Sequence, residues 1–365
     1  MASRLPDPHF WAGRSVLVTG HTGFKGGWLC HWLHEMGAEI HGLSLDPLSS
    51  PCMFDVTDVS ATLASDCRCD IGDLAALTSF MTASTPDVVF HMAAQPLVPQ
   101  GYEDPVGTWR TNVLGTVNVL EAVRSCPSVR SVVVVTTDKV YRNRGWLFPY
   151  RESDELGGLD PYSASKSATE FVSESYRHSF FSGADSGMAV LATARAGNVI
   201  GGGDWSVDRL VPDVLRALDE QVSLTLRDPG ATRPWQHVLD PLAGYLVLAE
   251  SIQEAERDEF PHEWNFGPDT AANASVTDVV NAIIDSAGSE VPRVIANNDP
   301  SREARLLALD SSRSRAILGW EPRWDLPKAL ARTLDWHKQW KSGGNMAIAT
   351  TSQIHDYVTG RGADG

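Results

Sequence analysis

The sequence has few cysteines, no long apolar run and fewer basic than acidic residues among its 365 positions. The five cysteines are odd in number and irregularly spaced, which excludes a regular disulfide framework and indicates reduced thiols in a cytoplasmic protein; they are Cys30, Cys52, Cys67, Cys69 and Cys126. Cys67 and Cys69 are too few for a zinc site, and we predict no metal.

Charge and hydropathy exclude two classes of partner. No stretch approaches the roughly 18 consecutive apolar residues of a membrane span, and the first residues, MASRLPDPHFW, lack the apolar core of a signal peptide. Thirty Lys and Arg residues against 46 Asp and Glu residues give a formal net charge of −16, which repels a phosphate backbone. We therefore expect neither a membrane nor a nucleic-acid partner. Hydrophobic residues at 42 % and charged residues at 21 % are typical of a globular chain with a sizeable core.

Strand-like and helix-like patterns alternate over the first 200 residues. The expected strands are 15–20, about 39–45, 87–92, 131–137 and 188–195, and the expected helices are 28–36, 74–82, 105–125 and about 162–182. This alternation implies right-handed crossovers and a parallel sheet covered on both faces. The predicted fold class is α/β with a doubly wound parallel sheet.

The alternation ends near residue 200, where segments such as GGGDW and RDPGATRPW appear. Helices are expected from there on at about 206–219, 238–253, 276–288, 311–318 and 327–341. We predict a sheet domain of residues 1–200 plus about 232–262, and a smaller, interleaved C-terminal lobe of about 201–231 plus 263–342. Residues 343–365 show no clear period and are assigned as a tail.

A glycine triplet follows the first expected strand and opens the first expected helix. Gly20, Gly23 and Gly26 give a GxxGxxG spacing. Residues without Cβ permit a tight turn and close approach of the backbone to a pyrophosphate, while the helix N-terminus favours the anion. The motif in this context indicates a dinucleotide site.

Acidic residues follow the next turns. Asp46 ends the second expected strand, where a carboxylate can accept hydrogen bonds from an adenosine ribose. No Lys or Arg lies between Lys25 and Arg68, which favours NAD over NADP. Asp70 and Ile71 either flank the adenine or form a surface turn.

Two groups of polar residues are suited to catalysis. Tyr162 and Lys166 are four residues apart and share one helical face, where the ammonium would favour the phenolate. The strand SVVVVTT ends in Thr136 and Thr137, followed by Asp138 and Lys139, at the sheet edge where such folds bind ligands.

Together these segments resemble the extended short-chain dehydrogenase/reductase family and, within it, the CDP-glucose 4,6-dehydratases. The resemblance runs from about Phe10 to Trp340 and rests on FWAGRSVLVTGHTGFKGGWL, FHMAAQPLV, TNVLGTVNVLE, TTDKVY, YRESDELGGLDPYSASK, RAGNVIGGGDW, RPWQHVLDPLAGYL, WNFGP and LGWEPRW. It implies a Rossmann fold with bound NAD, CDP-glucose as substrate, and a homodimer or homotetramer paired through helices 105–125 and 162–182.

The family's reaction is oxidation at sugar carbon 4, loss of water across carbons 5 and 6, and return of the hydride to carbon 6. The implied catalytic residues are Thr137, which hydrogen-bonds the carbon 4 oxygen, Asp138 as acid, Lys139, Tyr162 as the first base, and Lys166. Asp138 needs a raised pKa to hold a proton, and Lys139 acts either as the carbon 5 base, if its pKa is lowered, or as a stabiliser of the enolate.

The resemblance also implies the binding residues. Those expected at NAD are Gly20, Thr22, Gly23, Phe24, Gly26, Asp46, Asp70, Ile71, Ala93, Ala94, Gln95, Asn112, Tyr162 and Lys166. Those expected at the nucleotide sugar are Asn198, Arg209, Arg233, His237 and Asn265, and the planar guanidinium fork of arginine suits a diphosphate.

Three alternatives remain at this point. A nucleotide-sugar 4-epimerase shares the glycine loop, Asp46 and the Tyr–Lys pair, but needs no acid and base such as Asp138 and Lys139. A dehydratase of another nucleotide sugar is left open by Pro99–Tyr102, where the family pattern has Arg and then Ser. A regulatory NAD-binding protein without turnover would not need the catalytic set.

Overall fold

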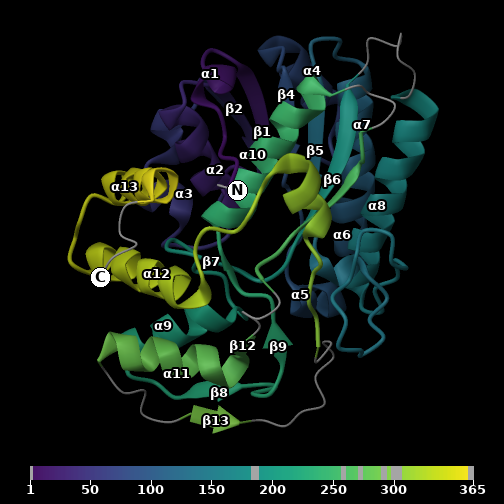
Figure 1. The fold of residues 1–365 in the computed structure, drawn as a ribbon. Coiled ribbons are helices and arrows are strands. Elements are labelled where there is room, and N and C mark those ends of the chain that lie inside the picture. The colour runs from purple at the N-terminus through teal and green to yellow at the C-terminus, as the bar shows by residue number, and fades with distance from the viewer. Residues whose placement is uncertain are drawn as a thin grey trace.

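The computed structural model describes residues 3–181, 189–255, 260–269, 274–288, 294–296 and 306–360. Seven strands form a central sheet in the order β11-β6-β5-β4-β1-β2-β3, and every pairing is parallel (Figure 1). Their bounds are β1 Ser15–Thr19, β2 Glu39–Ser44, β3 Ser65–Arg68, β4 Val88–His91, β5 Ser131–Val135, β6 Val190–Ala196 and β11 Glu263–Phe266. The predicted parallel sheet is confirmed.

Two of these strands differ from the prediction. The edge strand β3 was not expected, because its four residues, SDCR, are polar and only partly buried. Strand β11 lies in the sheet, although residues from 263 onward were assigned to the lobe. Its Trp264 and Phe266 are fully buried, and the Phe266 ring lies 5.6 Å from that of Tyr245, so burial of aromatic residues holds this strand on the sheet edge.

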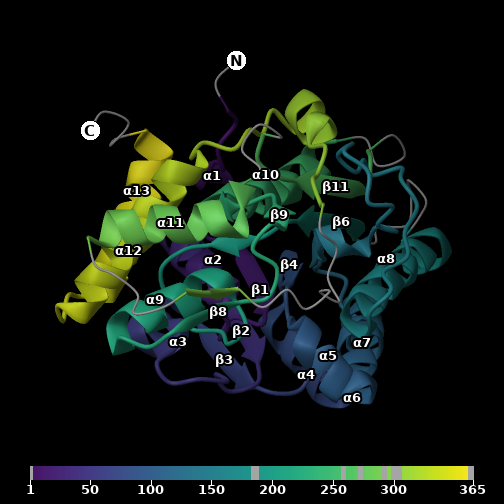
Figure 2. The same ribbon diagram turned by 90° about the horizontal axis from the view of Figure 1, so that it is seen from below.

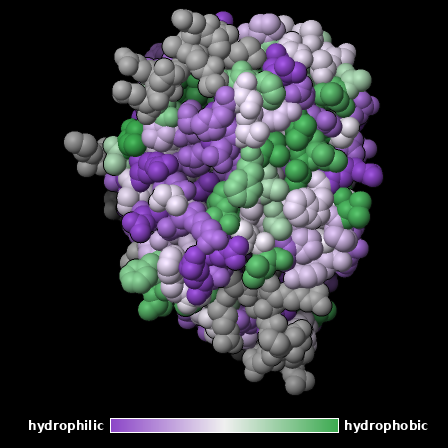
Figure 3. Space-filling view, turned by 90° about the vertical axis from the view of Figure 1, so that its right-hand side faces the viewer, coloured by the Kyte–Doolittle hydropathy of each residue, from purple (hydrophilic) through white to green (hydrophobic). Residues whose placement is uncertain are grey.

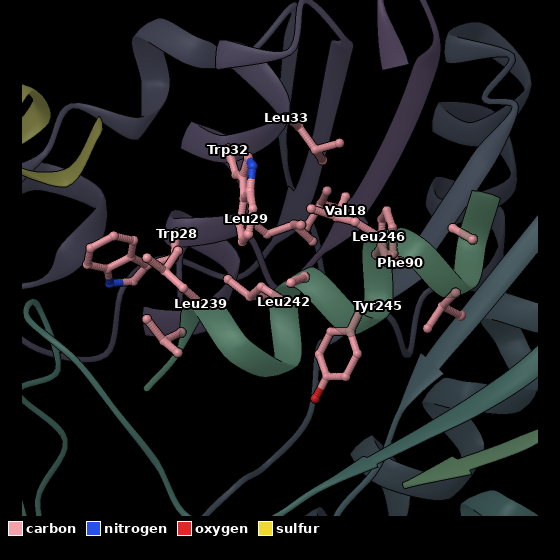
Figure 4. Packing of buried hydrophobic residues seen from close by; sticks show 14 of the residues in the cluster. Val18, Trp28, Leu29, Trp32, Leu33, Phe90, Leu239, Leu242, Tyr245 and Leu246 are labelled. Atoms are coloured by element: carbon pink, nitrogen blue, oxygen red, sulfur yellow. The ribbon is translucent and has the colours of Figure 1, made fainter. Parts of the chain in front are cut away.

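Helices cover both faces of the sheet. One face carries α2 (Phe24–Glu35) and α10 (Leu239–Glu254), and the other carries α4 (Leu74–Ser84), α7 (Gly115–Arg124) and α8 (Pro161–Phe180). Alternate strand residues face the two sides, as parallel sheets require. Figure 4 shows Trp28, Leu29 and Trp32 of α2 packed with Leu242 and Leu246 of α10.

Shorter helical segments connect these elements. They are α1 (Pro8–Trp11), α3 (Met53–Val56), η1 (Val59–Thr62), α5 (Val98–Glu103), α6 (Pro105–Trp109), η3 (Asp138–Val140) and the π-helical turns η2 (Arg110–Leu114) and η5 (Ser314–Leu318). The single helix expected over 105–125 therefore consists of α6, η2 and α7 in succession.

The lobe lies below the sheet in the view of Figure 1, and Figure 2 shows it from that side. It contains α9 (Leu210–Glu220), α11 (Val276–Ala287), and the pairs β8 (Leu224–Leu226) with β13 (Val294–Ala296) and β9 (Thr232–Arg233) with β12 (Ala274–Ser275). The pair β7 (Val199–Ile200) and β10 (Gln236–His237) stands between sheet and lobe. Helix α12 (Leu326–Lys341) packs on α11.

The segment assigned as a tail contains a helix, α13 (Met346–Thr359). It packs on α2 and α12, and the ring of its buried Tyr357 lies 5.6 Å from that of Trp32. The Tyr357 hydroxyl also donates a 2.8 Å hydrogen bond to the buried Asp240. Burial of one face thus makes this segment part of the fold.

Across the described part of the chain, every helix is too short or too polar to cross a lipid bilayer.

Candidate functional site

A cavity of about 360 Å³ lies at the carboxyl edge of the sheet, next to the lobe. Residues that follow β1, β2, β5 and β6 line it, and 203–206 together with Arg209 close it from the other side. Open α/β sheets bind their ligands at this edge. The cavity is therefore the place to test each predicted site residue.

The glycine loop shapes one end of the cavity. Gly20 has a φ of +79°, and a Cβ there would lie 2.8 Å from the backbone nitrogen of Ala93. A Cβ on Gly26 would lie 2.2 Å from the Gly20 carbonyl oxygen, so no larger residue fits this turn. Gly23 is the N-cap of α2 and supplies no capping side chain, which leaves the first N–H groups of the helix available to an anion.

Residues that follow β2 and β3 also line the cavity. Asp46, Asp70 and Ile71 all line it. The sequence argument against NADP was incomplete, because the unexpected strand β3 pairs with β2 and places the Arg68 guanidinium 3.7 Å from the Asp46 carboxylate. Here Arg68 is also held by Asp66, at 2.9 Å.

These observations fit a dinucleotide. The lining includes the Asp46 carboxylate, the glycine turn at the N-terminus of α2, and the Tyr162–Lys166 pair. Most of the predicted NAD residues line the cavity; they are Gly20, Thr22, Gly23, Phe24, Gly26, Asp46, Asp70, Ile71, Ala93, Ala94, Tyr162 and Lys166. Gln95 and Asn112 do not. The buried Asn112 amide instead binds the backbone of Gln95 and the Ser165 hydroxyl, so this pair holds the loop after β4 against α8.

Tyr162 and Lys166 are both buried on α8 and both line the cavity. Burial raises the pKa of Tyr162, while Arg209 and a hydrogen-bonding contact with Thr137 lower it. The Lys166 ammonium donates a hydrogen bond to the Val135 carbonyl at 3.2 Å. Burial also lowers the pKa of Lys166, to about 8.

Asp138 begins η3, three residues after the end of β5, and is buried. Its Oδ1 accepts a 3.0 Å hydrogen bond from the Thr137 hydroxyl, and its Oδ2 has no hydrogen-bond partner among the described residues. Burial raises the pKa of Asp138 against the opposing effects of Lys139, Thr137, Arg233 and Lys25. A carboxyl group in this environment holds a proton more readily than one in water, as the acid role requires.

Of the five predicted sugar-nucleotide residues, Arg209 lines the cavity and the other four do not. Arg209 lines the cavity and donates to the Pro96 carbonyl at 2.8 Å. Arg233 is buried close enough to Asp138 to influence its charge, and Asn198 is half-buried outside the lining, with its carbonyl bound to Gln236.

Neither His237 nor Asn265 lines the cavity. The Asn265 amide is fully buried and bonded to the Tyr141 hydroxyl and to the carbonyls of Tyr150 and Asp310. The His237 ring is fully buried 4.6 Å from that of Trp324, and burial lowers its pKa to about 3. Both side chains therefore serve the fold.

Some lining residues were not predicted as site residues. Lys25 lines the cavity near Asp138, Lys166 and Arg209, and burial lowers its pKa to about 8. Its place in the glycine loop was visible in the sequence, but its proximity to the catalytic residues was not. The lobe residues 203–206 gave no signal, because their approach depends on tertiary packing.

Comparisons with known proteins agree with this geometry. The sequence model of the NAD dependent epimerase/dehydratase family matches residues 16–267. A CDP-glucose 4,6-dehydratase of Salmonella typhimurium is 43 % identical over 356 residues, which cover 97 % of this chain and 98 % of that protein. A dTDP-glucose 4,6-dehydratase of Xanthomonas campestris is 27 % identical, with 88 % of this chain and 92 % of that protein covered.

Among solved structures, the protein MoeE5 in complex with UDP-glucose and NAD is similar with a TM-score of 0.75 at 25 % identity. The match covers 89 % of this chain and 99 % of that one.

Proposed function

Because the chain belongs to the NAD dependent epimerase/dehydratase family, we propose that it converts CDP-glucose to CDP-4-keto-6-deoxyglucose by NAD-dependent 4,6-dehydration. Membership of this NAD-dependent family confirms the resemblance inferred from the sequence. CDP-glucose is favoured over other nucleotide sugars because the CDP-glucose enzyme is 43 % identical, against 27 % for the dTDP-glucose enzyme.

One structural observation carries the choice of dehydration over epimerisation. The buried Asp138 has a raised pKa, its Oδ2 has no hydrogen-bond partner within the described ranges, and it adjoins Thr137, which lines the cavity with Tyr162. A 4-epimerase has no use for a protonated carboxyl at this position. Elimination of a hydroxyl group needs one, because hydroxide is a poor leaving group unless an acid protonates it.

The proposed roles follow from these positions. Tyr162 accepts the proton of the carbon 4 hydroxyl, and the positive charge of Arg209 stabilises its phenolate. NAD, when bound, supplies the hydride acceptor for carbon 4 and the hydride donor for carbon 6. The new carbonyl acidifies carbon 5, and Lys139 either removes its proton or stabilises the resulting enolate, while Asp138 protonates the departing carbon 6 hydroxyl. Arg209 contacts the diphosphate from the lobe side.

The test is incubation of the purified protein with NAD and CDP-, dTDP-, GDP- or UDP-glucose, followed by mass spectrometry. We expect a product lighter by one water, formed fastest from CDP-glucose. A product of unchanged mass would identify an epimerase, and faster turnover of another nucleotide would overturn the substrate. Tyr162→Phe is the inactive control. Tyr245→Phe is the matched active control, because Tyr245 is fully buried in α10 and does not line the cavity.

We also propose a homo-oligomer that pairs through α6, η2 and α8. Val106, Trp109, Leu114 and Phe171 are large apolar residues on these elements, between 42 and 67 % exposed. Figure 3, seen from the side of α6 and α8, shows apolar residues gathered on this face. Such patches mark contact surfaces. Sedimentation should give a dimer or tetramer that Phe171→Glu weakens, and a monomer would refute the proposal.

We propose a cytoplasmic location because the cysteines are free thiols. All five lie among the described residues and are free thiols, as in a reducing compartment. Fractionation of cells that make the protein tests this, and recovery outside the cytoplasm would contradict it.

A further inference from the structure

A buried ion pair connects α8, the helix that carries Tyr162 and Lys166, to strand β6. Glu170 lies on α8, one turn after Lys166, and Arg195 lies on β6; their exposed fractions are 3 % and 1 %. The guanidinium binds the carboxylate through two hydrogen bonds, Nε to Oε1 at 2.9 Å and Nη2 to Oε2 at 2.8 Å. This bidentate geometry fixes both side chains.

The same carboxylate binds two threonine hydroxyls. Thr193 on β6 donates to Oε2 at 2.7 Å, and Thr136, just after β5, donates to Oε1. Arg195 and these hydroxyls lower the pKa of Glu170 despite its burial, so the group stays ionised. Thr136 immediately precedes Thr137 and Asp138. Glu170 therefore places a fixed negative charge against the strand end that carries the catalytic residues.

That charge acts on Lys166. Burial lowers the pKa of Lys166 to about 8, and Glu170 is the carboxylate that opposes this effect. Lys25 on α2 also interacts with the ammonium and repels it, and His91 on β4 is neutral because burial lowers its pKa to about 3. Tyr162, on the same face of α8, is neutral too, because burial raises its pKa. Glu170, one turn along the same helix, is thus the carboxylate that favours the charged form of Lys166.

The pair is not explained by stability alone. A buried ion pair costs desolvation, and apolar residues of similar size often serve a core as well or better. We propose that Glu170, balanced by Arg195, is a positioning residue that keeps Lys166 in its ammonium form and anchors the end of β5 for catalysis. This rests on the proposed function, because it assumes that Lys166 works as an ammonium beside Tyr162 and the dinucleotide.

The experiment compares Glu170→Gln, the charge-balanced Glu170→Gln/Arg195→Gln, and the charge-retaining Glu170→Asp with the unchanged protein. NAD affinity and kcat with CDP-glucose are measured against pH. Loss of the carboxylate removes the attraction that favours the ammonium. In Glu170→Gln and in the charge-balanced variant, the upper pH limits of NAD affinity and of kcat should therefore move down by about one unit. About one unit above that limit, NAD binding should then be about tenfold weaker. Glu170→Asp should keep the upper pH limit close to that of the unchanged protein.

The control is Glu263→Gln, which removes the 2.6 Å ion pair with Arg177, farther along α8 and away from Lys166. It should leave both pH profiles unchanged. Wild-type profiles in a folded Glu170→Gln or in the charge-balanced variant would overturn the proposal and leave the pair a purely structural role. If Glu170→Gln alone fails to unfold cooperatively because Arg195 is left unpaired, the charge-balanced variant decides.

Failure of the proposed function is separately visible. If the unchanged protein does not convert CDP-glucose, the proposed function is wrong. The pH dependence of NAD binding still tests the role of Glu170 in that case.

Discussion

Two glycine substitutions distinguish the two effects of the glycine loop, which are the tight turn and the close approach of the backbone to a pyrophosphate. A Cβ on Gly23 meets no protein atom closer than the Gly20 carbonyl oxygen at 3.4 Å, and its φ of −80° suits any residue. Gly23→Ala should therefore fold normally and interfere only with the approach of a pyrophosphate. A Cβ on Gly26 would lie 2.2 Å from the same oxygen, so the turn must open by about 0.8 Å to reach a tolerable 3.0 Å.

The magnitudes follow from these distances. A hydrogen bond from a backbone N–H to a charged phosphate is worth about 1.5–3 kcal/mol, so losing one weakens NAD binding about 10–150-fold in both variants. Gly26→Ala should in addition destabilise the protein without NAD by about 1–3 kcal/mol, the usual cost of overpacking. Gly23→Ala should not.

The assay is NAD titration by calorimetry together with thermal unfolding with and without NAD. Gly230→Ala is the control, because a Cβ there would meet nothing nearer than an Asp228 oxygen at 3.9 Å. NAD affinity equal to wild type in Gly23→Ala would show that the dinucleotide does not lie against this loop. The reasoning from the cavity would then be wrong.

Three further predictions concern single side chains. Tyr162→Phe should lower kcat by about 10²–10⁴-fold with NAD affinity retained, because the first proton acceptor is lost. The control Tyr245→Phe should keep the wild-type kcat, and steady-state kinetics and calorimetry check both variants. Asp138→Asn should still oxidise carbon 4 but slow elimination by about 10²–10⁴-fold, seen as accumulated absorbance of reduced nicotinamide in stopped flow, and normal loss of water would exclude the acid role. Burial raises the pKa of Asp240 to about 7, so its ionisation in the unfolded state costs the folded protein stability as pH rises from about 4 to 7. Asp240→Asn should gain stability relative to wild type over that range and keep a constant gain above it in urea unfolding, and a gain that is independent of pH would contradict the shift.

The sequence predicted the elements whose patterns are local. The β-branched runs of β1 and β5 and the glycine loop before α2 carry their own signals, and Tyr162 and Lys166 share a face because helical spacing requires it. These features place the dinucleotide end and the catalytic helix without any tertiary information.

The rest depended on contacts between distant segments. Strand β3 is a polar edge strand, and α13 buries a face in which Ala349 and Gln353 stand among the larger apolar residues, so neither has a clear period. Asn265 and His237 match a family pattern, but which atoms surround them is decided by packing. The same holds for Glu170 and Arg195, which are 25 positions apart and meet only because α8 lies on β6.

The central claim is that one hydride leaves sugar carbon 4 and returns to carbon 6 of the same molecule after water is lost. CDP-glucose carrying deuterium at carbon 4 tests it directly when the product is analysed by mass spectrometry and NMR. The account predicts a 4-keto-6-deoxy product, lighter by one water, with the deuterium on carbon 6. An isomer of unchanged mass, or a dehydrated product without deuterium at carbon 6, would contradict it.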